Sequence, residues 1–96
     1  MATLNFITAY SSTLDGAINT EPSTTVFAED LGLCSTCVAE KGNCWACLQT
    51  TQQVFLDEAL TNVVPDGYYR YPYSAEEPNA TWYIVGGYPQ SGGFYN

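Results

Sequence analysis

The fold is decided by two segments near the end of the chain, GYYRYPY at residues 67–73 and ATWYIVGG at residues 80–87. Both are dense in aromatic and β-branched residues, which favour strands, and the loop at 74–79 that joins them is polar. The turn sequence PDG at 65–67 precedes the first segment. The two segments therefore predict a β-hairpin. Its first strand should end at Pro72 or lie at an edge, because proline has no N–H to donate.

Strand character continues upstream of this hairpin. Residues 4–10 alternate with a period near two, which predicts a strand with one face better buried than the other. Residues 24–28 are β-branched and aromatic and predict a second strand. Residues 11–24 are rich in turn formers and predict a turn or long loop. Residues 49–60 contain good helix formers, yet Val and Phe favour a strand at 54–56.

A short repeat links two of these strands. The pattern Val-Phe-apolar-acid-acid occurs at residues 26–30 and again at residues 54–58. If both copies form strands, the acid pairs lie at the strand ends, where charge discourages further pairing.

The chain of 96 residues is long enough for one domain with a modest core. Its composition, 46% hydrophobic and 15% aromatic, is that of an ordered protein. We expect a mostly β, small single domain of short antiparallel strands and hairpins with a four-cysteine knuckle and extended tails. The parts would be N-terminal strands and loops at 1–33, the knuckle at 34–47, the β-hairpin module at 50–87 and a Gly/Tyr-rich tail at 88–96. The tail is too rich in glycine for a helix, so it should be exposed and mobile or run over a neighbouring molecule.

The only cysteines form a Cys-x2-Cys-x6-Cys-x2-Cys pattern, made by Cys34, Cys37, Cys44 and Cys47. Four thiolates are the number and type that a structural, tetrahedral zinc site requires, and such a set leaves no open position for catalysis. The turn formers at 41–43 make the necessary chain reversal plausible. Two disulfides, Cys34–Cys47 and Cys37–Cys44, are the competing interpretation. The spacing does not match the usual iron–sulfur runs.

The charge balance excludes several partners. Lys41 and Arg70 alone oppose ten carboxylates, and the net charge of −8 repels nucleic-acid phosphates and anionic membrane surfaces. We therefore expect neither direct nucleic-acid binding nor membrane insertion, since no apolar run approaches the length of a membrane span. The N-terminal residues do not resemble a secretion signal, so synthesis in a cytoplasm is expected.

Catalysis is also disfavoured. The chain has no histidine, the commonest general base and catalytic metal ligand. The acid pairs at 57–58 and 76–77 are adjacent in sequence, and on a strand such neighbours point to opposite faces. No glycine-rich phosphate-binding loop precedes a helix. We expect a protein that is not an enzyme.

The aromatic residues of the hairpin are the candidate interface or ligand-binding set. The chain has eight tyrosines, and each tyrosine combines an apolar ring with a polar tip, which suits both a core and a contact surface. On alternating strands only about half of the rings can share a face. One face would be core and the other an interface with protein or with the sugar rings of a glycan receptor. The set comprises Tyr68, Tyr69, Tyr71, Tyr73, Trp82 and Tyr83.

Residues 54–69, VFLDEALTNVVPDGYY, together with WYIVGG at 82–87, resemble a short Tyr/Gly-rich β-hairpin module of bacteriophage tail-fibre and other virion structural proteins. The resemblance implies that Phe55, Leu60, Tyr68 and Trp82 pack the hairpin. It also implies an architectural role: a tail, baseplate, fibre-attachment or capsid accessory subunit, held by other virion proteins in a symmetric assembly. Such a subunit would be made in the host cytoplasm and end in the virion. The alternatives are a carbohydrate-binding module and a small acidic zinc-stapled regulator of a host protein.

Overall fold

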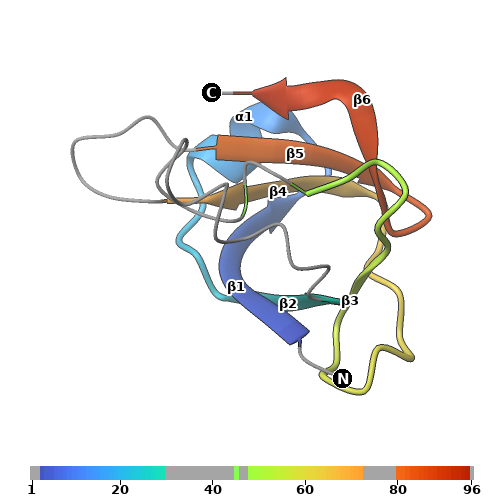
Figure 1. Ribbon diagram of the computed structural model, residues 1–96. Helices are drawn as coiled ribbons and strands as arrows, with labels where there is room; N and C mark the ends of the chain where they lie inside the picture. The colour runs from blue at the N-terminus through green and yellow to red at the C-terminus, as the bar shows by residue number, and fades with distance from the viewer. Residues whose placement is uncertain (1–2, 30–44, 46–47, 73–79, 96) are drawn as a thin grey trace, which may run out of the picture.

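Six strands and one short helix make up the part of the chain described by the computed structural model, residues 3–29, 45, 48–72 and 80–95 (Figure 1). The mostly β prediction is confirmed. In chain order the elements are β1 (Thr3–Ser11), α1 (Leu14–Ile18), β2 (Thr24–Glu29), β3 (Val54–Phe55), β4 (Gly67–Tyr71), β5 (Ala80–Val85) and β6 (Tyr88–Tyr95).

The strands form one antiparallel sheet in the order β3-β2-β1-β4-β5-β6. β1 is central: residues 3–8 pair with β2, and residues 9–11 pair with β4. Figure 1 shows β1 bending strongly between its two partners, so that the sheet curls around an interior. The curl brings β3 to the turn between β5 and β6, where the Val54 N–H donates to the Gly87 carbonyl at 2.7 Å. The two ends of the sheet therefore meet at this point.

The predicted hairpin is confirmed as β4 and β5, with Tyr69 opposite Trp82 and Tyr68 opposite Tyr83. β4 ends at Tyr71, directly before Pro72, as the missing N–H of proline requires. The loop at 74–79 lies outside the described residues.

The Val-Phe repeat lies on neighbouring strands. β2 pairs with β3 so that Phe27 is opposite Phe55. In both copies the valine, Val26 or Val54, is fully buried and the phenylalanine points to the other face. β3 is shorter than expected, since Leu56 lies outside it.

The segment after β3 forms a tight loop that returns to pair Phe55 with Val63. The Asp57 carboxylate accepts hydrogen bonds from the Thr61 hydroxyl and from the backbone N–H groups of Thr61 and Asn62. These bonds, the Thr61 hydroxyl first, hold the pKa of Asp57 below its ordinary value. The turn also places Leu60 at φ 60, in the left-handed region.

The segment expected to be only a turn or loop contains the helix α1. Thr13 caps it, because its hydroxyl accepts from the Gly16 N–H at 3.0 Å. Glycine is needed in this helix for space, because a Cβ on Gly16 would lie 2.0 Å from the Ser11 hydroxyl oxygen. The glycine lets the helix lie close to the end of β1.

The expectation of an exposed, mobile tail is wrong, because residues 88–95 form β6 and pair with β5. Gly86 and Gly87 have φ values of 62° and 86° and make the turn between the strands. Gly92 has φ 75° where the register shifts between Trp82 and Ile84. The glycines that argued against a helix are those that shape this strand.

Candidate interaction surface

The inner face of the sheet is filled by the protein's own side chains. Its buried cluster is Phe6, Val26, Ala28, Trp45, Leu48, Val54, Val64, Tyr69, Trp82 and Ile84. Three of the predicted site residues belong to this interior: Tyr69 and Trp82 are in the cluster, and Tyr71 packs against it. The Tyr69 hydroxyl donates to the Pro65 carbonyl, and burial raises the pKa of Tyr69, with Tyr10 and Asp66 adding to the effect. These aromatic residues are therefore structural.

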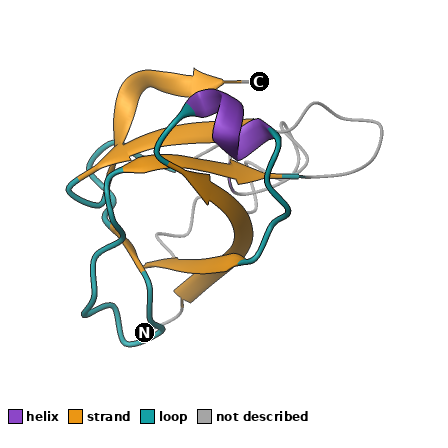
Figure 2. Cartoon of the chain, turned by 180° about the vertical axis from the view of Figure 1, so that it is seen from behind, coloured by secondary structure: helices purple, strands orange, loops and turns teal. Residues whose placement is uncertain are grey.

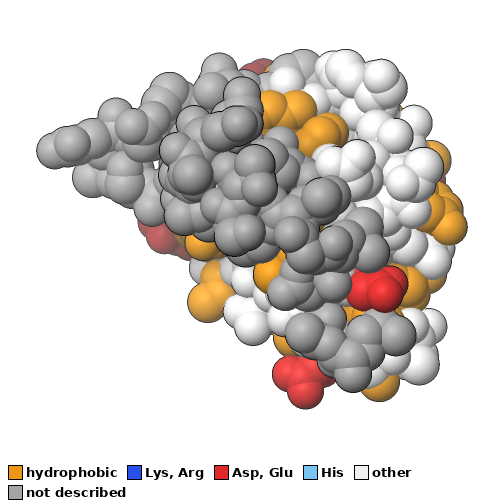
Figure 3. Space-filling model, viewed as in Figure 1, with side chains coloured by type: hydrophobic (Ala, Val, Ile, Leu, Met, Phe, Trp, Pro, Cys, Tyr) orange, Lys and Arg blue, Asp and Glu red, His pale blue; other side chains and the backbone are white. Residues whose placement is uncertain are grey.

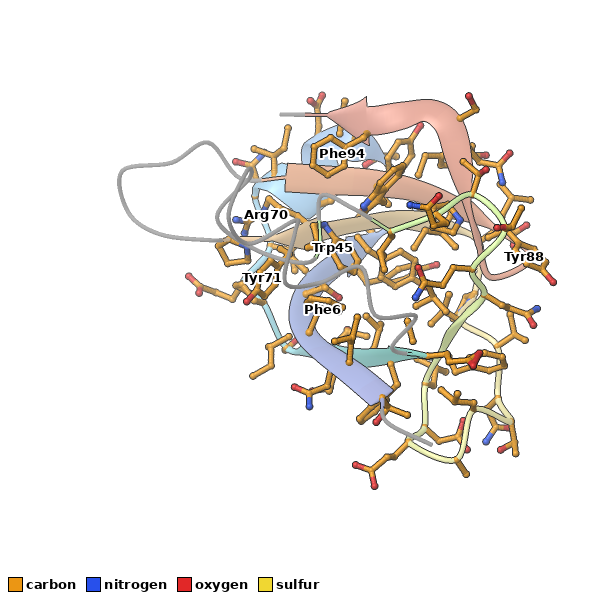
Figure 4. The ribbon with its side chains drawn as sticks, viewed as in Figure 1. Phe6, Trp45, Arg70, Tyr71, Tyr88 and Phe94 are labelled. Atoms are coloured by element: carbon orange, nitrogen blue, oxygen red, sulfur yellow. The ribbon has the colours of Figure 1, made fainter. Side chains whose placement is uncertain are left out.

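Trp45 is a core residue that the sequence analysis did not single out. Its side chain is fully buried. Its ring lies edge-on to Phe6 at a centroid distance of 5.0 Å, and its centroid is 6.0 Å from that of Tyr71. Figure 4 labels the three side chains. Its carbonyl accepts a hydrogen bond from the Trp82 indole N–H at 2.8 Å. A large aromatic residue inside the cysteine segment was the signal for this anchor.

The four cysteines, Cys34, Cys37, Cys44 and Cys47, and the candidate residue Tyr73 lie outside the described residues. Two of the cysteines, Cys44 and Cys47, are close in sequence to Trp45. In the described ranges no three His, Cys, Asp or Glu side chains gather as a metal site. Zinc binding and two disulfides therefore both stay predictions from the sequence.

The outer face of the hairpin carries the remaining predicted tyrosines. Tyr68 and Tyr83 are directly opposite across β4 and β5, and their rings are 4.8 Å apart with an interplanar angle of 32°. Both are partly exposed. Alternation places Val85 on the same face, and its cross-strand partner Tyr88 is 40% exposed. Figure 4 shows Tyr88 at the margin of the molecule, pointing away from it. The predicted division of the rings between two faces is confirmed for the described residues.

Of the four residues that the resemblance implies as packing residues, Trp82 alone lies in the buried cluster. Phe55 and Tyr68 point to the outer face and are partly exposed, and Leu60 lies in the loop after β3.

A second outer surface lies on β1, β2 and β3. The register aligns Asn5, Phe27, Phe55 and Val63 across neighbouring strands, so these residues share the outer face. Ile7, two positions along β1 from Asn5, is on the same face and is 56% exposed. Val63 is 39% exposed, and the two phenylalanines are partly exposed. We call Ile7, Phe27, Phe55 and Val63 the outer apolar stripe.

Arg70 has a structural position on the outer face. It is 7% exposed, its Nε donates to the Ala17 carbonyl at 2.8 Å, and a terminal nitrogen donates to the Thr20 carbonyl at 2.7 Å. These carbonyls belong to the last turn of α1 and the residues after it, where a cation is favourable. Arg70 thus fastens α1 to the outside of the sheet. Figure 2 shows the helix lying against the strands.

Among the described residues, the exposed side-chain charge is consequently of one sign. Arg70 is the only Lys or Arg in the described ranges, and there it faces no carboxylate in an ion pair. The view in Figure 3 accordingly shows red and orange atoms but no blue among the coloured residues. The described carboxylates are Asp15, Glu21, Glu29, Asp57, Glu58 and Asp66.

Comparisons with family models, curated proteins and solved structures give no match to this chain. Among the described residues, no helix has the length and apolar character to cross a membrane.

Proposed function

We propose that this protein is a non-enzymatic structural subunit of a bacteriophage particle, in the tail, baseplate, fibre attachment or capsid surface. The observation that carries the proposal is the outer face of the sheet, which presents large apolar side chains such as Ile7 on strands held rigidly by a filled interior. Apolar residues that share an exposed face favour contact with another protein. A small domain of this kind gains stability from the assembly that it joins.

The proposal is tested by particle association. Antibodies raised against the purified protein would be used to follow it through density-gradient fractionation of a lysate in which it is produced naturally. A particle subunit is expected to band with the virions at a fixed ratio to the major capsid protein and to remain there after a high-salt wash. Recovery only in the soluble fractions would contradict the proposal.

We further propose that the four cysteines bind one structural zinc ion, with two disulfides as the competing state. Native mass spectrometry of protein purified under reducing conditions is expected to show one zinc, which a chelator removes, because four thiolates complete a tetrahedral shell. The Cys34→Ser variant should lose the metal. A mass lower by four hydrogens, restored by a reductant and insensitive to chelator, would establish the disulfides instead.

A carbohydrate-binding module is the second candidate, and the outward Tyr68–Tyr83 pair favours it, because adjacent aromatic faces can stack against sugar rings. Binding to a glycan array that Tyr83→Ala abolishes would favour this function over a purely architectural role. Phe27→Ala is the control, since Phe27 is a partly exposed aromatic residue of β2, a strand that neighbours neither β4 nor β5.

A further inference from the structure

The outer apolar stripe is a continuous surface because of strand register. Phe27 is opposite Phe55, and Phe55 is opposite Val63, so the three side chains occupy successive positions across the sheet. Directly opposite residues have Cβ atoms about 5 Å apart. Ile7 is opposite Thr25 and therefore diagonal to Phe27, at about 7–8 Å. With Ile7 at 56% and Val63 at 39% exposure, the two ends of the stripe are open to a partner.

The charges beside this stripe are negative. Glu29 is on the outer face of β2, two positions after Phe27, and Asp57 and Glu58 follow Phe55 in the chain. In the described ranges no cation is free to neutralise these carboxylates, since the guanidinium of Arg70 donates its hydrogen bonds to backbone carbonyls in and after α1. The stripe is thus bordered at one end by carboxylates that can attract a cationic partner.

This charge pattern selects among the possible occupants. A second copy of the chain would bring its own net charge of −8 to the contact, and like charges oppose association. A segment with Lys or Arg around a short apolar centre supplies both the apolar contact and the positive charge that the described residues around the stripe lack.

We infer that the outer apolar stripe docks a cationic amphipathic polypeptide segment of a partner protein, with apolar side chains against Ile7 and Phe27 and basic side chains toward Glu29 and the acids after Phe55. This inference rests on the proposed function, for which it names the chemistry of the neighbouring subunit. Added salt would weaken the contribution of the charged contacts to the affinity, and it would leave the contribution of the apolar contacts unchanged.

The test uses a fluorescently labelled synthetic peptide that alternates Lys with Ile, and measures its Kd for the full-length protein by anisotropy. The Ile7→Ser variant, which keeps every charge, is expected to weaken binding about tenfold by removing apolar contact. Ile18→Ser is the matched control, because Ile18 is 51% exposed but lies on α1. The control should bind as the unmodified protein does, and the unfolding midpoint of each variant verifies its fold.

The charged part is tested separately. Glu29→Gln is expected to weaken binding about two- to fivefold, the range of an exposed ion pair. Glu21→Gln removes the same charge beyond the opposite end of β2 and should have a smaller effect. Peptides that replace Ile with Ser, or Lys with Glu, should bind at least tenfold more weakly than the Lys/Ile peptide.

Three results would overturn the inference: equal effects of Ile7→Ser and Ile18→Ser, equal binding of the Lys/Ser peptide, or a homodimer that Ile7→Ser dissociates in sedimentation experiments. Its failure is distinguishable from failure of the proposed function. A protein that bands with virions but ignores the Lys/Ile peptide retains the function and loses the inference. If the protein binds the peptide through Ile7 but never bands with virions, the docking surface is supported and the proposed function is contradicted.

Discussion

Replacing Trp45 with alanine is expected to lower the free energy of unfolding by about 3–5 kcal/mol, as removal of a fully buried large aromatic side chain does. The Trp45 ring packs against Phe6 and Tyr71 within the buried cluster, so its removal takes away a large part of the apolar contact in the interior. Urea unfolding followed by circular dichroism measures the loss. For a domain of this size the change is a large share of the total stability.

Trp45→Phe is the control, because it keeps an aromatic ring in the same place and should cost about 1–2 kcal/mol. The Trp82 indole bonds to the backbone carbonyl of residue 45, so neither substitution removes that acceptor. A loss below about 1 kcal/mol for the alanine variant would show that Trp45 is not the anchor described here.

Replacing Arg70 with methionine is expected to destabilise the protein by about 2–3 kcal/mol. The methionine retains the apolar stem, but the Ala17 and Thr20 carbonyls lose a charged donor in a buried position. Hydrogen exchange should accelerate most in α1 and the residues that follow it, since Arg70 holds them to β4. Urea unfolding gives the size of the loss, and exchange gives its location.

Two controls separate this anchoring from a general effect of charge. Arg70→Lys keeps the positive charge but replaces the guanidinium, which donates to two carbonyls, with a single ammonium nitrogen. It should therefore recover part of the stability. Repetition in high salt screens repulsion among the surface carboxylates but leaves a buried hydrogen bond intact. A defect of Arg70→Met that disappears in high salt would contradict the anchoring role.

Local patterns predicted most of the strands, because side-chain alternation along a strand and the residues that favour turns can both be recognised in short stretches of sequence. The hairpin of β4 and β5, the strand over residues 4–10 and the division of the tyrosines between two faces follow from alternation alone. The Val-Phe repeat was visible, although its pairing depends on the register of β2 with β3.

The features that were missed depend on contacts between distant residues. Gly16 favours a turn by composition, and the support that Arg70 gives to the Ala17 carbonyl comes from a residue far along the chain. The glycines near the C-terminus likewise gave no local sign of β6, which forms because β5 offers an edge. Trp45 was overlooked because the cysteines around it suggested a metal site, whereas its ring belongs to the core.

The central place of β1 in the sheet bears on how the chain folds during synthesis. β1 can pair with β2 as soon as residue 29 has left the ribosome, but Ala9 must wait for Arg70, and the buried cluster is completed only when Trp82 and Ile84 of β5 arrive. Pairings between such distant residues slow folding and leave apolar surface exposed meanwhile. β1, the earliest strand of this sheet to be synthesised, is therefore among the last to complete its pairing, and the nascent hairpin of β1 and β2 is open to aggregation or to a chaperone.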